Sequence, residues 1–253
     1  MREFYKIEEI CDIEEGKFNV LLPEVTKKKV QIIDDVEPKE NFVLILFLQA
    51  ITMVKRDYIT YNEDVLKRAN VERKRKQRKT KYEKHLERTF AYELYRIWQN
   101  LVMLYIGPNL RVDAEIGKKI TYGRIDYSKL AKLKGERKIP DLVLHNSQGN
   151  TQHHTIICEI KRDEQLGKTK IKDDLIKLCR YMDAKIWDNN PYKFGCFILA
   201  SIDRDFDDLK RSVLLLKKEL KPYYDKINPD HLLIVLYDGD LVRYDTLKII
   251  LEI

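Results

Sequence analysis

The sequence predicts a mixed α/β fold in which helices cover a β-sheet. Segments with apolar residues at helical spacing alternate with short apolar runs that are bounded by turn residues. Their order along the chain is helix, strands, helix, strand, helix and strand, which is typical of a mixed sheet with helices on both faces. The chain has 253 residues, 44% of them apolar, and this length is sufficient to bury a large interior.

Residues 1–78 are predicted to form an N-terminal extension that ends in a basic helix or linker, and residues 79–253 to form the core. Within the extension, the run 41–54 has the composition of a buried helix. It is the longest apolar run, and Gln49 and Thr52 interrupt it, so it is too short to cross a bilayer. We therefore expect no membrane association.

The cysteines and the N-terminus indicate a cytoplasmic protein. No signal peptide is recognisable at the start of the chain. The four cysteines are far apart and lack the paired spacing of metal sites, and three of them lie within apolar patterns. We expect reduced core thiols at these positions, which are Cys11, Cys158, Cys179 and Cys196.

Positive charge is concentrated in two segments. The formal net charge is +7, and the segments 72–84 and 117–138 each hold eight Lys or Arg and two acidic residues. Such focused basic patches suit a polyanionic partner. A solvated helix face or linker is the alternative for 72–84. The residues expected to bind nucleic-acid phosphates are Arg73, Lys74, Arg75, Lys76, Arg78, Lys79, Arg124, Lys134, Arg137 and Lys138.

A long amphipathic helix is predicted from residue 79 to 105. Its apolar stripe consists of Leu86, Phe90, Leu94, Ile97, Leu101 and Leu104. Glu93 lies inside this stripe, and a carboxylate there needs a partner. An ion pair with Arg96 or a hydrogen bond with Thr89 would supply one. The segments 111–116 and 120–125 are then predicted to be strands.

The apolar runs 139–144 and 155–160 flank a set of turn-forming residues and predict a β-hairpin. Strand alternation places Glu159 and Lys161 on one face of a strand that is apolar on both faces. If the hairpin is centred on Asn150, Asp141 lies opposite Glu159, with Cβ atoms about 5 Å apart. A tighter turn would shift this register by one residue. Two carboxylates at that separation form an attractive position for a hard divalent cation.

Pro140-Asp141 and Glu159-Ile160-Lys161, separated by 17 residues, resemble the motif of the PD-(D/E)XK nuclease superfamily. The resemblance covers residues 81–200 approximately and implies a restriction-endonuclease-like mixed β-sheet flanked by helices. It also implies that Asp141 and Glu159 hold magnesium, while Lys161 orients or activates the attacking water. In this superfamily the helix before the Pro-Asp strand often supplies another acidic group. Glu93 is therefore the expected third ligand, and Glu87 is a weaker candidate.

The second half of the chain is predicted to continue the sheet and its helical cover. We expect helices at 170–187 and 205–221, strands at 194–200 and 231–237, and a closing segment at 241–253 that follows an Asp238-Gly239 turn.

Four polar positions in this half require an interpretation. Lys177 and Tyr181 have a spacing similar to the Gln-x-x-x-Tyr element of one branch of the superfamily, but we expect a solvated lysine and a half-buried tyrosine. His154 is expected at the surface. His145 lies on the same strand face as Asp141 and is expected near the site.

These observations lead us to expect a metal-dependent nuclease that acts on DNA in preference to RNA. Its cofactor would be Mg²⁺, with Mn²⁺ as a substitute, and a homodimer would serve double-strand cutting. The catalytic residues would be Asp141, Glu159 and Lys161. The alternative is a catalytically inactive protein that uses the same fold to bind nucleic acid or a partner.

Overall fold

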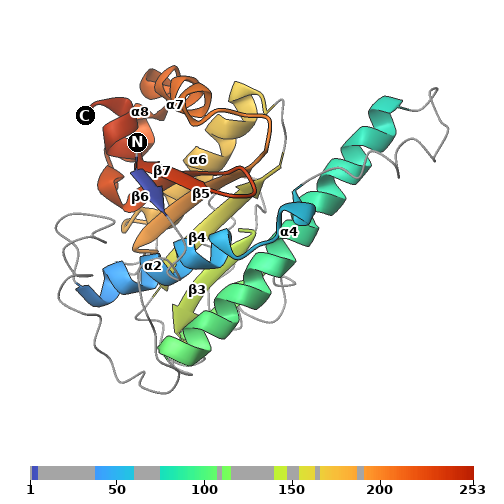
Figure 1. Ribbon diagram of the computed structural model, residues 1–253. Helices are drawn as coiled ribbons and strands as arrows, with labels where there is room; N and C mark the ends of the chain where they lie inside the picture. Colours follow the sequence, from blue (N-terminus) through green and yellow to red (C-terminus); the bar gives the residue numbers. More distant parts are fainter. Residues whose placement is uncertain are drawn as a thin grey trace.

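The computed structural model describes residues 2–4, 38–59, 75–106, 110–114, 140–146, 154–162, 166–186 and 191–253. In these ranges the strands form one mixed sheet in the order β1-β7-β6-β5-β4-β3-β2 (Figure 1). The strands are β1 (Arg2–Phe4), β2 (Leu110–Ala114), β3 (Leu142–Asn146), β4 (His154–Lys161), β5 (Phe194–Ala200), β6 (Leu232–Tyr237) and β7 (Val242–Thr246).

Strand direction changes at β4. The strands β2, β3 and β4 are antiparallel neighbours, whereas β4, β5 and β6 run parallel and β7 returns antiparallel to β6. Helices make the connections between the parallel strands. Every residue of β5 and β6 is buried, which is expected for parallel strands that are covered on both faces.

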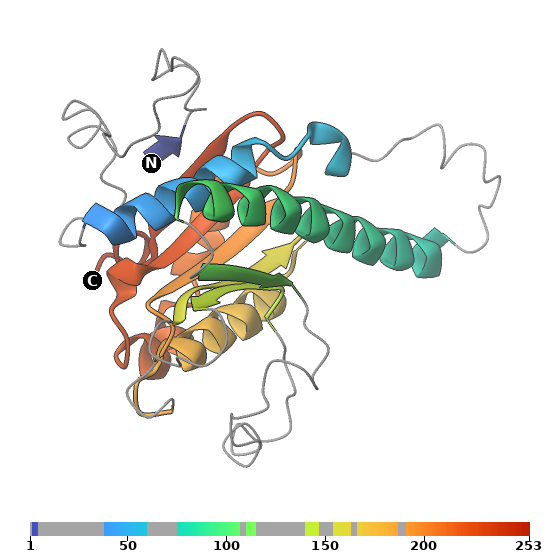
Figure 2. The same ribbon diagram turned by 90° about the horizontal axis from the view of Figure 1, so that it is seen from below.

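The helices lie in two layers on opposite faces of this sheet (Figure 2). One layer contains α2 and α4, which pack with alternate β4 residues such as Ile156, Cys158 and Ile160. On the other face, residues of α6, α7, α8 and α9 pack with Ile157 and with residues of β5 and β6. The helices are α2 (Pro38–Thr52), α4 (Arg75–Tyr105), α6 (Lys168–Met182), α7 (Phe206–Leu214), α8 (Lys217–Tyr224) and α9 (Leu247–Leu251), with short 3₁₀ turns η2 (Arg56–Tyr58) and η4 (Pro229–His231).

The helix α2 belongs to the main hydrophobic core. Residues 43–48 of α2 are all buried, and Phe47 packs on Trp98 of α4 with ring centroids 4.6 Å apart. The expected boundary between residues 78 and 79 falls inside α4, which is continuous from residue 75 to residue 105. The described part of the expected N-terminal extension therefore contributes to the same core as the rest of the chain.

The amino-terminal part of α4 extends beyond the sheet (Figures 1 and 2). With 31 residues and a rise of about 1.5 Å per residue, this helix is about 46 Å long. Its carboxyl-terminal part covers the sheet, since Phe90, Leu94 and Trp98 are fully buried there. The projecting part carries most of the basic segment 72–84.

Two predicted elements have different boundaries in the structure. The predicted helix 205–221 is broken between α7 and α8, yet its apolar stripe from Phe206 to Leu220 stays buried through the break. The segment 241–253 contains β7 and then α9, which begins where the Thr246 side chain accepts a hydrogen bond from the Ile249 N–H. The Asp238-Gly239 turn is confirmed, and Gly239 has a φ of 104°.

A glycine allows α6 to approach the sheet closely. A Cβ atom at Gly195 of β5 would lie 2.6 Å from Met182 Sδ and 2.8 Å from Leu232 Cδ1. Because glycine has no side chain, α6 packs against β5 at this point and presents its inner face to β4 and β5.

Cys158, Cys179 and Cys196 are buried free thiols, as expected, whereas Cys11 lies outside the described residues. Within the described ranges, no helix has the length and apolarity needed to cross a membrane.

Candidate active site

The hairpin of β3 and β4 has the predicted register next to the Pro-Asp motif. Leu142 lies opposite Cys158, and Asp141 N–H donates to the Cys158 carbonyl at 3.1 Å. The paired residues begin at Leu142, and Asp141, just before the strand, lies near enough to Glu159 to raise the pKa of that carboxyl. A register shift occurs between Leu144 and His145, so the pair nearest the turn, His145 and His154, has the register of the tighter turn.

Asp141 is held by a backbone hydrogen bond. Its Oδ2 atom accepts from the Ile160 N–H at 2.7 Å. Asp141 lies just before β3, and its carboxylate is partly exposed. This bond orients the carboxylate toward the end of β4, where Lys161 lies.

Lys161 lies among carboxylates from three elements. Its Nζ atom is 3.7 Å from Glu87 Oε1 of α4, 3.9 Å from Asp141 Oδ2 and 3.6 Å from Asp174 Oδ2 of α6. The same ammonium donates to the Ile160 carbonyl at 2.9 Å. Burial by itself lowers the pKa of Lys161, but Asp141, Asp174, Glu87 and Glu159 together outweigh burial and raise it. Lys161 therefore stays protonated at neutral pH.

Glu159 and Lys177 form a buried pair. Lys177 Nζ lies 2.5 Å from Glu159 Oε1, and the two side chains are 8% and 2% exposed. Burial and the neighbouring Asp141 raise the pKa of Glu159 to about 8, while Lys177 and Lys161 oppose this rise. The prediction of a solvated Lys177 and a half-buried Tyr181 is wrong, because both side chains are buried on the inner face of α6.

We call Glu87, Asp141, Glu159, Lys161, Asp174 and Lys177 the carboxylate–lysine cluster. When all six groups are ionised, four negative and two positive charges leave a net charge of −2. The pKa of Glu87 is also raised, first by burial and then by Asp141 and Asp174, although Lys161 opposes the change. The cluster thus has more carboxylate groups than ammonium groups in a partly buried position. A divalent cation bound there would offset the excess negative charge.

Glu93 does not occupy the position expected for it. Its carboxylate forms a bidentate pair with Arg96, at 2.7 and 2.9 Å, which is the structural alternative that the sequence left open. Glu87 contacts Lys161 instead. Residues six apart on an α-helix point about 120° away from each other, so Glu87 and Glu93 cannot both face the end of β4.

Asp174 was not predicted as part of the site, and Lys177 was noted only for its spacing from Tyr181. Asp174 lies three residues after Ile171 and four before Leu178, so it interrupts the apolar stripe of α6 as Glu93 interrupts that of α4. The same pattern that selected Glu93 would have selected Asp174. Lys177 is three residues further along the helix and faces the same strands.

Some predicted nucleic-acid-binding residues lie outside the described residues, namely Arg73, Lys74, Arg124, Lys134, Arg137 and Lys138. The others are on the projecting part of α4, namely Arg75, Lys76, Arg78 and Lys79.

The histidines lie at the opposite end of the hairpin from the cluster. His145 Nε2 is 2.5 Å from Asp113 Oδ2 of β2, and Arg111 pairs with the same carboxylate at 3.0 Å. His145 is four residues along the strand from Asp141, a separation of about 13 Å. It is thus not near Lys161. His154 is half-buried against Tyr192, with ring centroids 4.6 Å apart, and burial lowers its pKa to about 4.

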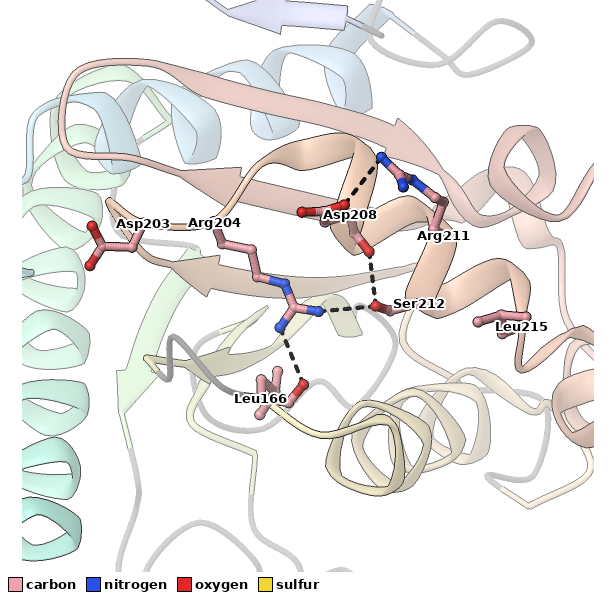
Figure 3. A pocket seen from close by; sticks show the side chains of 7 residues that line it. All are labelled: Leu166, Asp203, Arg204, Asp208, Arg211, Ser212 and Leu215. Atoms are coloured by element: carbon pink, nitrogen blue, oxygen red, sulfur yellow. Dashed lines mark hydrogen bonds and ion pairs between the residues drawn. The ribbon is translucent and has the colours of Figure 1, made fainter.

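A second polar region follows the ends of β4 and β5. An open hollow of about 490 Å³ is lined there by side chains of α7 and of the segments that lead into α6 and α7 (Figure 3). Arg204 donates to the Leu166 carbonyl at 3.2 Å and to Ser212 Oγ at 3.0 Å, while Arg211 pairs with Asp208 at 3.2 Å. Arg204 therefore joins the two connecting segments and α7, whereas the Arg211 pair lies within α7.

The donor set of the cluster suits a hard cation that takes few ligands from the protein. Within the described ranges, no group of three His, Cys, Asp or Glu side chains is arranged to hold a metal ion. Mg²⁺ requires no such cage, because it is commonly bound by one or two carboxylates together with water and substrate phosphates. Asp141 and Glu159, on adjacent strands, are the two carboxylates that fit this mode.

Comparison of the chain with protein-family models, curated proteins and solved structures finds no significant match.

Proposed function

We propose that this protein is a metal-dependent nuclease that hydrolyses phosphodiester bonds, with DNA as the favoured substrate. The observation that carries the proposal is the meeting of the Pro-Asp and Glu-x-Lys motifs, in which Asp141 Oδ2 accepts a hydrogen bond from the Ile160 N–H at 2.7 Å and lies 3.9 Å from Lys161 Nζ. Glu87 of the preceding helix supplies a further acidic group next to Lys161. A restriction-endonuclease-like fold is part of the same proposal.

In this proposal Asp141 and Glu159 bind Mg²⁺, or Mn²⁺ in its place. The ion would lower the pKa of a bound water and neutralise charge on the phosphate. Asp141 is already oriented for this task by the Ile160 N–H. Glu159 contributes as a carboxylate once it has lost its proton, and its raised pKa shifts that loss to about pH 8.

Lys161 acts as a hydrogen-bond donor and a positive charge. Because nearby carboxylates keep it protonated, it does not serve as a general base at neutral pH. Its ammonium instead holds the attacking water and stabilises the negative charge that develops on the phosphoryl oxygens. Glu87 and Asp174, at 3.7 and 3.6 Å, hold this ammonium next to Asp141.

The basic composition of the projecting part of α4 is evidence for a polyanionic substrate. Lys and Arg residues dominate residues 75–84, and this part of the helix extends away from the sheet (Figure 1). A basic helix of this kind contacts the phosphate backbone without reading the sequence.

The second candidate function is a catalytically inactive protein that binds nucleic acid or a partner through the same fold. One observation favours it. Lys177 already contacts Glu159 Oε1 at 2.5 Å, so one of the two expected metal ligands has an ammonium partner.

Cleavage assays with a matched lysine variant separate the two functions. Circular, linear and single-stranded DNA are incubated with the protein in Mg²⁺, Mn²⁺ or EDTA. We expect metal-dependent cleavage by the wild type and by Lys172→Ala, which removes a lysine of α6 that pairs with Glu219 of α8. Lys161→Ala is expected to bind DNA and keep its circular dichroism spectrum but not to cleave. Binding without cleavage of any substrate by the wild type would favour the inactive protein.

A further inference from the structure

Glu159 has a direct cationic partner within the protein. Lys177 Nζ is 2.5 Å from Glu159 Oε1, whereas Lys161 Nζ stays 3.6 Å or more from the carboxylates of Glu87, Asp141 and Asp174. Lys177 comes from α6, on the face of the sheet that Glu159 also occupies. Of these two lysines, Lys177 is the one in contact distance of a proposed metal ligand.

A divalent cation and this ammonium compete for the same carboxylate. Hard divalent cations bind carboxylate oxygens at about 2.0–2.6 Å. An ammonium 2.5 Å from the same oxygen would lie within a few ångströms of the ion. Both side chains are almost fully buried, so water screens the repulsion between the two positive charges only weakly.

Lys177 also offsets the negative charge of Glu159 when no cation is bound. Glu159 is 2% exposed and near Asp141, so once it is ionised it would be a buried charge close to a like charge if it had no positive partner. Lys177 removes that conflict. The lysine has a long flexible stem, which permits it to leave the carboxylate when a stronger cation arrives.

We propose that Lys177 is the resident counter-ion of Glu159 and that a divalent cation must displace it, so that Lys177 sets the cation affinity of the site. This inference rests on the metal binding in the proposed function. The wild-type protein should therefore bind free Mn²⁺ or Mg²⁺ more weakly than a variant that lacks the Lys177 ammonium. The cost of displacing Lys177 is then met when substrate phosphates add their own ligands to the ion.

Mn²⁺ titration of the DNA-free protein tests the inference. The free ion is followed by electron paramagnetic resonance above about pH 8, where Glu159 is ionised in the wild type. We expect Lys177→Gln to bind Mn²⁺ roughly 5- to 150-fold more tightly than the wild type, the range typical of coupled binding events. Lys177→Arg keeps the charge and should gain nothing. Lys172→Gln removes a surface lysine from the same helix and is the matched control.

Three further results decide the mechanism. The gain should disappear when Glu159→Gln is combined with Lys177→Gln, because Lys177 is inferred to act through Glu159. Unchanged affinity in Lys177→Gln, or a gain that persists without Glu159, would overturn the inference. If Lys177→Gln folds only when Mn²⁺ is present, the cation has replaced the lysine and the inference stands.

Chemical labelling of the wild-type protein tests the inference without a variant whose folding depends on Mn²⁺. Acylation of lysines, followed by mass spectrometry, should be slow at Lys177 without Mn²⁺ and faster at saturating Mn²⁺, with Lys172 unchanged. Equal labelling of Lys177 in both states would contradict displacement.

These outcomes are separable from the nuclease proposal. Tighter Mn²⁺ binding by Lys177→Gln, with no DNA cleavage by the wild type, supports the inference and argues against the nuclease. DNA cleavage by a wild type that binds Mn²⁺ as tightly as Lys177→Gln supports the nuclease and overturns the inference. Absence of Mn²⁺ binding to both proteins overturns the inference and the metal site together.

Discussion

Asp141 Oδ2 accepts a hydrogen bond from the backbone N–H of Ile160 at 2.7 Å. This bond links the residue before β3 to the residue between Glu159 and Lys161, so that the Pro-Asp and Glu-x-Lys parts of the site are joined directly. The carbonyl that accepts a hydrogen bond from the Lys161 ammonium belongs to the same residue, Ile160. The orientation of Asp141 and that of Lys161 therefore both depend on the backbone of Ile160.

Asp141→Asn removes the negative charge of this side chain but keeps its shape, so it separates metal binding from the hydrogen bond to Ile160. The amide oxygen can still accept from the Ile160 N–H, so unfolding in urea should show a decrease in stability of only about 1 kcal/mol or less. DNA cleavage should be abolished, since a neutral amide is a poor ligand for a hard cation. Asp141→Ala, which leaves that N–H without its acceptor, should be less stable by about 1–3 kcal/mol. An Asn variant with wild-type cleavage would remove Asp141 from the proposed metal site.

Glu159 should give the protein an unusual pH dependence of stability. Its pKa is about 8 in the folded protein and near 4.5 in the unfolded chain, so between these values the folded state holds a proton that the unfolded state has released. Stability should fall as the pH rises from about 4.5 to about 8, by at most about 1.4 kcal/mol per pH unit. Urea unfolding of the wild type and Glu159→Gln across this range measures the contribution.

His154 has the opposite effect and makes that comparison necessary. Its pKa of about 4 in the folded protein is below its usual 6.5, so its contribution to stability is lost as the pH falls between these values. Only the difference between wild type and Glu159→Gln isolates the carboxyl. Parallel stability curves for the two proteins would contradict the raised pKa of Glu159.

Glu87 and Glu93 form a matched pair on one helix. Glu87 contacts Lys161 at 3.7 Å, whereas Glu93 is held by Arg96. We expect Glu87→Gln to slow DNA cleavage about 10- to 100-fold, the effect typical of groups that orient a catalytic residue. Glu93→Gln should cleave at nearly the wild-type rate. Initial cleavage rates of the two variants under identical conditions make the test, and equal reductions would show that helix α4 rather than Glu87 is responsible.

The basic residues of α4 should control DNA affinity and its salt dependence. Replacing Arg75, Lys76, Arg78 and Lys79 by glutamine is expected to weaken binding to all duplex sequences alike. The slope of log affinity against log salt should decrease by about 0.9 for each DNA phosphate that the variant no longer neutralises. A control with the same charge change replaces four lysines of the α8 region, Lys217, Lys218, Lys221 and Lys226. Equal effects of both variants would mean that net charge, and not α4, governs binding.

The hairpin of β3 and β4 shows how much of the structure can be predicted from residues that are close along the chain. Alternation along 155–160 and a turn centred on Asn150 predicted Asp141 opposite Glu159, and β3 and β4 have the corresponding register from Leu142 to Leu144. Next to the turn His145 lies opposite His154, which is the register of the tighter turn, and the irregularity after Leu144 restores the predicted one. Register depends on neighbouring residues and turn geometry, which are both local properties. The buried strand β5 was predicted with its observed boundaries for the same reason. The break between α7 and α8 was not predicted, because the apolar stripe continues through it.

The choice of partners within the site required the three-dimensional arrangement. Glu87, Glu93 and Asp174 all lie in or beside apolar stripes, and the pattern does not say which strand each one faces. The packing of α4 turned Glu87 toward Lys161, whereas Glu93 pairs with Arg96 of the same helix. The packing of α6 against Gly195 brought Asp174 and Lys177 to β4.

The sequence by itself determined the α/β class, the principal helices and strands, and the hairpin that brings Pro-Asp and Glu-x-Lys together, because periodicity and turn chemistry act between residues that are close along the chain. Only the tertiary structure decided that Glu87, Asp174 and Lys177 join Asp141, Glu159 and Lys161. Those contacts connect segments far apart in the sequence, and the rotation and distance of each helix on the sheet depend on how the whole core packs.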